Sequence, residues 1–344
     1  MNDRILRALR REPVDCTPVW FMRQAGRALP KYREKRADRD MFALLRDPPA
    51  AAEITVMPLE YFPVDAAVLY NDLVTPFFGA GIDLRMEVGV GPVVGNPIQT
   101  PADIDRLTPF DPRIALDWSL KQIRLVRTMI DVPVLGFIGA PFTLCSYLIK
   151  GKHSRQQEEI KEFIWRDPSA WHTLAGFWTD HLAEYGIAQY EAGAAAIQVF
   201  DSWVGSVGPE DYEEHIFPHT SALFQKMGDA GVPTIHFFTG NPALLPLIAD
   251  AGGDAISVDW RLPIDVAWDM VGEERAIQGN LDPVVLLAGR TAALPKVRAI
   301  LDRIGGRPGH IFNLGHGILP GTDHEVIRAV AEFVHEYDAS KVGA

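Results

Sequence analysis

Cysteine is scarce in this sequence, and a long apolar run is missing from it. Only Cys16 and Cys145 occur among the 344 residues, too few for a disulfide framework or a closed thiolate metal site. No stretch of about 18 apolar residues appears, so we expect no membrane-spanning helix. Residues 1–16 are charged throughout and have no apolar segment, so we expect no signal peptide. These absences favour a protein of the reducing cytoplasm.

Positive charge is also in short supply. The chain has 33 Lys and Arg against 45 Asp and Glu, a formal net charge of −12, which argues against nucleic acid or an anionic membrane as a general partner. One window reverses this balance, because Arg23 to Arg39 holds seven basic residues against only Glu34 and Asp38. The window predicts either a landing site for an anionic small molecule or a solvated basic face, and charge alone leaves both open.

The motifs of nucleotide-binding folds are missing too. No Gly-x-Gly-x-x-Gly follows the first expected strand and no P-loop lysine motif occurs. What is present is a repeat of short apolar or β-branched runs closed by turn residues. These expected strands are Pro18–Met22, Asp65–Tyr70, Val134–Ile138, Ala195–Phe200, Thr234–Phe238, Ala255–Val258, Arg275–Gln278 and His310–Asn313.

Helical patterns lie between most of these runs. Residues 114–130 space Trp118, Leu125 and Met129 on one face, residues 168–192 open with the Asp167-Pro168 pair, and a capping box from Thr322 to Glu325 begins the last helix. The pattern of residues 85–98 predicts a small hairpin. The alternation favours an α/β fold, a closed (β/α)8 TIM barrel in a single domain over residues 1–344, with an open Rossmann sheet as the alternative.

Polar and glycine-rich segments come directly after the expected strands. In a barrel these positions converge on the mouth formed by the carboxyl ends of the strands, where active sites lie. The segments are Arg23–Arg27, Asn71-Asp72, Gly139–Thr143, Asp201–Trp203, Thr239–Asn241, Asp259-Trp260, Gly279–Pro283 and Leu314–Gly317. The sequence therefore predicts one pocket built from scattered motifs.

Two of these segments carry the charges that a binding site needs. Arg23 and Arg27 flank Gly26 after an apolar strand, and their planar guanidinium forks suit carboxylates; the alternative is a pair of surface arginines. Asp72 follows an apolar run, where a carboxylate must be paired, ligating or catalytic, or else cap a helix. From the residue alone, these roles of Asp72 stay open.

The uncharged candidates are weaker individually. The position of Tyr147 suits a core aromatic residue as well as a ligand-binding one. The position of Ser202 suits a helix cap as well as a hydrogen-bond donor to a ligand. His316, between two glycines after the last strand, is the histidine most suited to reach the mouth. A zinc site would need convergent partners, and no His-x-Cys or Glu-x-x-His spacing organises His215, His219 and His236, so we expect no metal.

At this point four strings of the sequence resemble a known family. They are PVWFMRQAGR (Pro18–Arg27), GFIGAPFTL (Gly136–Leu144), QGNLDP (Gln278–Pro283) and NLGHGILP (Asn313–Pro320), and they closely resemble the uroporphyrinogen decarboxylases from about Thr17 to Val334. The resemblance implies a (β/α)8 barrel that forms homodimers. It also implies removal of carbon dioxide from the four acetate side chains of uroporphyrinogen III, giving coproporphyrinogen III, without a cofactor.

The resemblance also implies roles for particular residues. Asp72 would stabilise the transition state and accept hydrogen bonds from the pyrrole N–H groups. Arg23, His316 or a bound water would supply protons, with Tyr147 orienting the reacting acetate. The substrate-binding residues carried over by motif are Arg23, Gln24, Ala25, Gly26, Arg27, Asp72, Tyr147, Ser202 and His316.

Three other classes of protein compete with this interpretation. A corrinoid methyltransferase would use thiolate-bound zinc, and neither cysteine is in a His-x-Cys pair. A Schiff-base aldolase would want a lysine at a strand end, and none of the expected strand ends has one. A tetrapyrrole carrier would need Asp72 and the arginines for binding alone, and the sequence does not separate it from an enzyme.

Overall fold

The computed structural model describes residues 2–37, 39–87, 89–152 and 157–338. Its centre is a parallel sheet of seven strands in the order β1-β4-β5-β6-β7-β8-β9. The strands are β1 (Ala67–Val68), β4 (Val134–Gly139), β5 (Ala196–Asp201), β6 (Thr234–Phe238), β7 (Ala255–Ser257), β8 (Ala276–Leu281) and β9 (His310–Leu314). Because the order follows the chain without reversal, the sheet lacks the switch point of a Rossmann fold.

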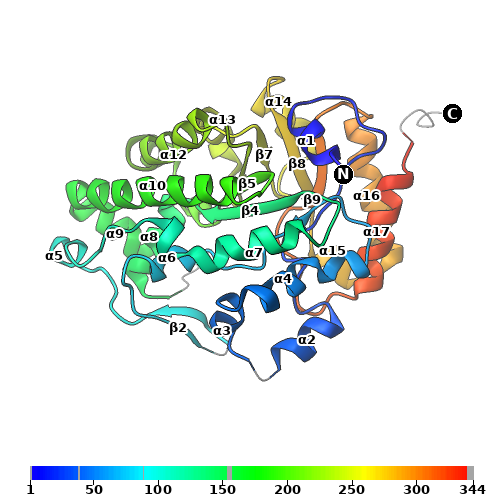
Figure 1. Cartoon of the computed structure of the whole chain (residues 1–344). Helices are drawn as coiled ribbons and strands as arrows, with labels where there is room; N and C mark the ends of the chain where they lie inside the picture. The colour runs from blue at the N-terminus through cyan, green and yellow to red at the C-terminus, as the bar shows by residue number, and fades with distance from the viewer. Residues whose placement is uncertain (1, 38, 88, 153–156, 339–344) are drawn as a thin grey trace.

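Helices follow the strands and cover the outside of the sheet (Figure 1). The α-helices are α1 (Arg4–Leu9), α2 (Pro30–Arg36), α3 (Met41–Leu45), α4 (Pro48–Val56), α5 (Pro101–Ile104), α6 (Pro112–Ala115), α7 (Asp117–Arg127), α8 (Pro141–Lys150), α9 (Glu158–Arg166), α10 (Pro168–Glu191), α11 (Pro209–Asp211), α12 (Phe217–Asp229), α13 (Leu245–Ala251), α14 (Ile264–Val271), α15 (Val284–Leu287), α16 (Arg290–Ile304) and α17 (His324–Glu336). Short helical turns are η1 (Met57–Glu60), η2 (Thr75–Phe78), η3 (Val204–Ser206), η4 (Tyr212–Ile216) and η5 (Pro242–Leu244). No helix in the described ranges is both long and apolar enough to cross a membrane.

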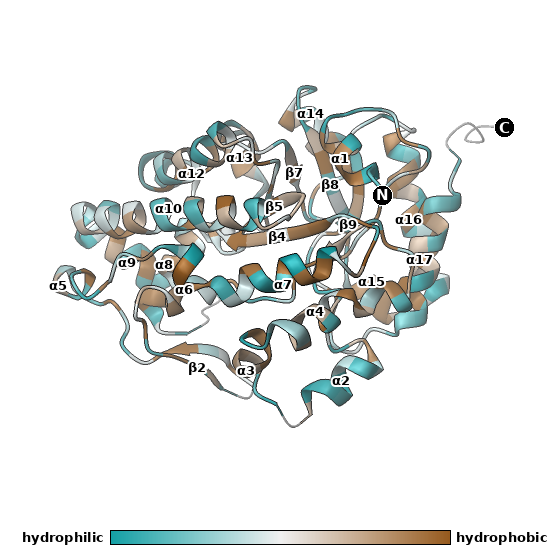
Figure 2. Ribbon diagram, in the orientation of Figure 1, coloured by the Kyte–Doolittle hydropathy of each residue, from teal (hydrophilic) through white to brown (hydrophobic). Residues whose placement is uncertain are grey.

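The strands are apolar because both of their faces are covered, as is usual in parallel sheets. All residues of β6, β8 and β9 are buried. Figure 2 shows the hydrophobic colouring concentrated on strands such as β4, whereas the helices alternate between hydrophobic and hydrophilic residues. The sequence therefore places a buried sheet inside a layer of amphipathic helices.

Side chains that meet inside the sheet show that it is curled. Gln278 on β8 donates to Gln198 on β5 at 2.9 Å and to Ser257 on β7 at 2.8 Å. The indole N–H of Trp20 donates to the side-chain Oε1 of Gln278 at 2.9 Å. Strands β5 and β8 are not neighbours, so these contacts require the sheet to bend round on itself.

The extended segment 18–22 lies between the two edges of this sheet. Val19 forms a parallel bridge with Phe312 of β9, and Phe312 N donates to Pro18 O at 2.8 Å. On its other side, Val19 O accepts a hydrogen bond of 2.8 Å from Asp65 N, just before β1. The expected strand at 18–22 is therefore present only as an isolated bridge.

One end of the curled sheet is closed by α1. Its buried residues Ile5, Ala8 and Leu9 belong to an apolar cluster with residues of the inner strand faces, including Leu135 and Ile235. Asp65, 1% exposed, ties this end together. Its carboxylate accepts hydrogen bonds from Asn2 (2.7 Å), Arg4 (2.9 Å), Val19 N (2.8 Å) and His335 (2.7 Å). The opposite end, at the carboxyl termini of the strands, is left open.

Several details differ from the sequence prediction. The second expected strand, Asp65–Tyr70, has only Ala67–Val68 in strand conformation. The last helix is capped by Asp323, which accepts from Glu325 N at 2.9 Å, so the expected capping box at Thr322 is wrong. The helix at 114–130 is broken at Leu116 into α6 and α7.

The expected apolar face of that helix is also wrong. Leu125 and Met129 are 38% and 48% exposed, and α7 instead buries Ser119 and Gln122 beside its apolar residues. By contrast, the hairpin expected at 85–98 is confirmed as β2 (Leu84–Glu87) and β3 (Gly91–Val94), which pair in antiparallel fashion. The start of α10 at Asp167-Pro168 is confirmed too, with Asp167 accepting from Ala170 N at 2.9 Å.

Candidate active site

All of the substrate-binding residues that the resemblance implied line one cavity of about 910 Å³. Four of the eight segments expected at its mouth contribute no lining residue, namely Gly139–Thr143, Thr239–Asn241, Asp259-Trp260 and Gly279–Pro283. The cavity lies at the carboxyl ends of the strands, on the side away from α1. The residues that line it include Arg23, Gln24, Ala25, Gly26, Arg27, Asp72, Tyr147, Ser202 and His316. Apolar side chains such as Phe137, Phe200, Phe237 and Ile318 form much of the remaining wall. The structure thus brings together residues from five separate segments of the chain.

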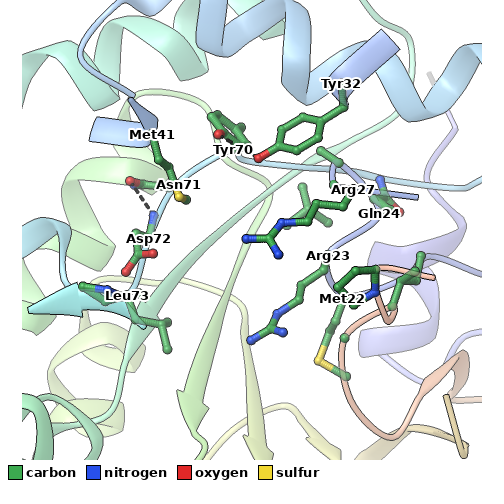
Figure 3. A pocket seen from close by; sticks show the side chains of 18 of the residues that line it. Met22, Arg23, Gln24, Arg27, Tyr32, Met41, Tyr70, Asn71, Asp72 and Leu73 are labelled. Atoms are coloured by element: carbon green, nitrogen blue, oxygen red, sulfur yellow. Dashed lines mark hydrogen bonds between the residues drawn. The ribbon is translucent and has the colours of Figure 1, made fainter. Parts of the chain in front are cut away.

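Arg23 and Arg27 extend into this cavity from the loop after segment 18–22 (Figure 3). Both side chains line the cavity and are exposed, and neither guanidinium group has an acidic partner among the residues described. Most other basic residues of the window from Arg23 to Arg39 are occupied elsewhere: Lys31 pairs with Glu60 and Lys35 with Glu53. Asp38, counted in that window, lies outside the described residues. In so acidic a protein, two unpaired arginines facing one cavity indicate an anionic ligand.

The turn that carries the arginines is held by its own residues. Arg23 has φ +62, a left-handed conformation unusual for a residue with a side chain. Gln24, 1% exposed, accepts from Phe21 N at 3.0 Å and donates to Ala66 O at 2.9 Å. A side chain at Gly26 would lie 2.8 Å from Arg23 O. Gln24 and Gly26 therefore shape the turn, which aims the two guanidinium groups.

Asp72 lies across the cavity from the arginines (Figure 3). Its backbone N–H donates to Asn71 Oδ1 at 2.9 Å, and Asn71 is itself fixed by a hydrogen bond of 2.8 Å to Tyr185. One carboxylate oxygen of Asp72 accepts from Val74 N at 3.1 Å. Burial raises the pKa of Asp72, and the Val74 hydrogen bond and the charge of Arg23 oppose that rise. A carboxylate whose pKa is raised by burial is stabilised in its charged form by a ligand that donates hydrogen bonds or carries positive charge.

Tyr147 and Ser202 line the cavity from α8 and from the end of β5. Both are half-buried. Burial, followed by the charge of Asp72, raises the pKa of Tyr147, so its hydroxyl stays protonated and can donate. A hydrogen bond of 3.0 Å from Thr143 on α8 to Asp201 on β5 joins the two elements. This hydrogen bond fixes the positions of Tyr147 and Ser202 relative to each other.

His316 lies in the loop after β9, beside Arg23. Its Nδ1 accepts a hydrogen bond of 2.8 Å from Gly317 N, which leaves the proton of the neutral ring on Nε2. Burial, with the charge of Arg23, lowers the pKa of His316 to about 4. At neutral pH this histidine is therefore a hydrogen-bond donor without a charge.

The rim of the cavity contains residues that the sequence did not single out. Tyr32, Arg36 and Arg39 approach it from α2 and the turn that follows, Tyr70 lies just after β1, and Glu87 lies on the hairpin. The excess of basic residues from Arg23 to Arg39 was the only signal for Arg36 and Arg39. No sequence signal pointed to Tyr32 or Tyr70, because the contact between these two residues depends on how α2 packs.

The residues of the competing interpretations lie elsewhere. Neither Cys16 nor Cys145 lines the cavity, and no lysine does so in the part of the chain described. His215 and His219 are outside the sheet, and His236 is bonded to Gly252 O at 3.1 Å. Among the described residues, no group of His, Cys, Asp and Glu could hold a metal ion.

Comparison with known proteins identifies relatives over nearly the whole chain. The family model for uroporphyrinogen decarboxylase (URO-D) matches residues 1–337. A uroporphyrinogen decarboxylase of Sorangium cellulosum is 46% identical over 337 residues, which cover 97% of this chain and 96% of that protein. One of Streptomyces coelicolor is 46% identical over 330 residues, covering 96% and 93%.

Solved structures extend the comparison to the fold. A methyltransferase from Methanosarcina mazei superposes with a TM-score of 0.79 at 22% identity, covering 97% of this chain and 98% of that one. At that identity the likeness concerns the fold alone. The family model and the curated relatives settle the family: this chain belongs to the uroporphyrinogen decarboxylases.

Proposed function

We propose that this protein decarboxylates uroporphyrinogen III to coproporphyrinogen III in porphyrin and haem biosynthesis. The observation that carries the proposal is the placement of Asp72 opposite Arg23 and Arg27 in one largely apolar cavity. Uroporphyrinogen has carboxylates around its edge and pyrrole N–H donors at its centre. A basic wall facing one half-buried carboxylate complements both features of such a ligand.

Binding divides between the two walls of the cavity. Arg23 and Arg27 hold peripheral carboxylates through bidentate hydrogen bonds. Asp72 accepts hydrogen bonds from the pyrrole N–H groups and gathers the flexible macrocycle around itself. Because the backbone of Asp72 is fixed through Asn71, the macrocycle is oriented as well as bound.

The reaction needs a place for an electron pair as carbon dioxide leaves. Protonation of the ring α-carbon next to the carbon that carries the acetate makes the pyrrole an iminium-like electron sink conjugated with the acetate methylene. The bond between the acetate methylene and its carboxylate then breaks, its electron pair neutralises the iminium, and an exocyclic methylene remains. Protonation of that methylene gives the methyl group, and loss of the proton first added to the ring restores the pyrrole, so the substrate supplies its own sink and no cofactor is required.

Asp72 accelerates this step by electrostatics. The ring becomes positive only after protonation, so the carboxylate stabilises the transition state more than the ground state. His316, neutral at physiological pH, donates from Nε2 to a substrate carboxylate, and Tyr147 and Ser202 donate from their hydroxyls. Arg23 or a bound water delivers the proton.

We further propose that segment 18–22 closes the sheet as an eighth strand, so that the chain is a single (β/α)8 barrel domain that works as a cytoplasmic homodimer. Support for closure comes from the bridge of Val19 to Phe312 on one side and its hydrogen bond to Asp65 N on the other. Support for the dimer and for the location comes from the resemblance to the family. Sedimentation of the purified chain at micromolar concentration tests the dimer.

Anaerobic incubation with uroporphyrinogen III, followed by chromatography of the products by carboxylate number, tests the function. We expect the eight-carboxylate substrate to pass through seven, six and five carboxylates to four, with release of carbon dioxide. Binding without a change in carboxylate number would show a carrier protein and overturn the proposal.

A further inference from the structure

A corner of the cavity is formed by two tyrosines with no role in the mechanism above. Tyr32 on α2 and Tyr70, just after β1, both line the cavity and are 6% and 5% exposed. Their hydroxyl oxygens are 3.1 Å apart, and their rings meet edge to face with centroids 5.8 Å apart. Figure 3 shows the two hydroxyls facing each other on the side of the cavity where Arg27 lies.

This pair has one hydroxyl proton that its own hydrogen bond does not use. Two phenols carry two protons, and the bond between them uses only one. The other proton finds no acceptor among the described residues. Because buried tyrosine hydroxyls usually have a partner, the unused donor suits an acceptor that arrives in the cavity.

The surroundings favour an anionic acceptor. Burial raises the pKa of Tyr70, the neighbouring Tyr32 raises it further, and the charge of Arg36 opposes the rise. The phenol therefore stays protonated and available as a donor. A hydroxyl that donates to a carboxylate makes a short, charge-assisted bond.

The pair is also rigidly placed relative to Asp72. Tyr70 N donates to Thr55 Oγ1 at 2.9 Å, and Gln122 donates to Thr55 Oγ1 at 2.9 Å and to Tyr70 O at 3.1 Å. Thr55 and Gln122 are fully buried. Tyr70 is two residues before Asp72, so a group bound by the pair has a fixed position relative to the carboxylate.

We propose that the hydroxyl pair of Tyr32 and Tyr70 binds one carboxylate of the substrate as a neutral donor, in addition to the arginines. This inference rests on the proposed function, because it assigns a subsite for the same polycarboxylate ligand. The bound group is either an acetate, which is lost in the reaction, or a propionate, which the product keeps. The pair therefore helps to determine which way round the macrocycle lies.

Conservative variants test the proposal. Tyr32→Phe, Tyr70→Phe and the double variant remove hydroxyls while keeping the rings, and Tyr190→Phe, on the outer helix α10 and 37% exposed, is the matched control. The double variant is expected to raise KM for uroporphyrinogen by about 10-fold, the usual effect of losing a hydrogen bond to a charged group. Its kcat should stay within about 2-fold, because binding alone is affected, and the control should match the parent.

Inhibition by coproporphyrinogen identifies the bound group. Weaker inhibition of the double variant indicates a propionate, whereas unchanged inhibition with a raised KM indicates an acetate, and both support the subsite. An unchanged KM with a lower midpoint of unfolding in urea would show that the hydroxyls only attach α2, and would overturn the proposal.

Equilibrium binding of uroporphyrinogen without oxygen separates this inference from the proposed function. If the parent protein binds the macrocycle without converting it, the function fails, while weaker binding by the double variant still supports the subsite. Equal binding by parent and double variant would overturn the subsite even if the parent is fully active. A parent that neither binds nor converts the macrocycle would overturn both.

Discussion

Gly317→Ala tests the position of Arg23 without removing it. A methyl group at residue 317 would lie 2.7 Å from Arg23 Cγ, 2.9 Å from Nε, and closer still to Cδ. Carbon atoms in contact are normally about 3.5–4.0 Å apart, so the arginine side chain has to move by roughly 1 Å. Gly317 does not have a positive φ, so alanine fits the backbone itself.

The expected effect is on substrate binding and turnover, because a shift of about 1 Å in a positioning group can cost on the order of 10²-fold in rate. We expect kcat/KM for uroporphyrinogen to fall by about 10- to 100-fold, since Arg23 can partly readjust. Anaerobic steady-state kinetics measure this, together with the urea midpoint of unfolding, which should stay near that of the parent.

Gly321→Ala is the matched control, four residues further along the same loop. Its added methyl group would meet only Leu287 Cδ2, at an ordinary 3.7 Å, so its kinetics should equal those of the parent. If Gly317→Ala folds and shows the same kcat/KM as this control, the exact position of Arg23 is not used and the reasoning is refuted.

Three other perturbations address the clamp, the closed end of the sheet and the absence of a cofactor. Arg27→Ala should cost about 2–5 kcal/mol in kcat/KM, and Arg27→Lys should rescue it poorly because lysine lacks the bidentate fork; near-parental kinetics in both would place Arg27 outside the substrate contact. Asp65→Ala should lower the free energy of unfolding by about 3–5 kcal/mol, because it leaves Arg4 Nη1, Val19 N–H and His335 Nε2 without their acceptor, although Arg4 keeps Asp15. Burial alone would raise the pKa of Asp65, but the hydrogen bond and charge of His335, together with the other donors, lower that pKa. The stability that Asp65 contributes is therefore present at neutral pH and is lost as the pH falls below about 3.9, the ordinary aspartate value. Urea unfolding of the parent and of Asp65→Ala from pH 7 to pH 3 measures this contribution, and equal midpoints throughout would contradict it. Activity should survive exhaustive chelation and should not respond to pyridoxal phosphate, thiamine diphosphate or flavin; a loss that one metal restores would contradict a reaction in which the substrate is its own electron sink.

The positions of the charged site residues could be predicted from the sequence. Arg23, Asp72 and His316 each follow an apolar run, and in a curled parallel sheet all such positions meet at one end. That inference needed only the alternation of strands and helices. The cavity lined by all of them confirms that they come together, while their chemical roles stay predictions.

The features that were missed depend on contacts between distant segments. Ser119 and Gln122 are buried because Ser119 bonds Tyr185 at 2.7 Å and Gln122 bonds Thr55 at 2.9 Å, so hydropathy pointed to the wrong face of α7. The Tyr32–Tyr70 pair joins residues 38 positions apart. No local pattern in the sequence signals a partnership of this kind.

The most direct test of the central claim is the kcat of Asp72→Asn on uroporphyrinogen without oxygen. This substitution nearly preserves volume but removes the negative charge that stabilises the protonated pyrrole. We expect kcat to fall by roughly 10²- to 10³-fold, as on losing an aligned electrostatic stabiliser, and Asp72→Glu to keep more activity than Asp72→Asn. A correctly folded Asp72→Asn with the parental kcat would contradict the account and leave Asp72 as no more than the acceptor for Val74 N–H.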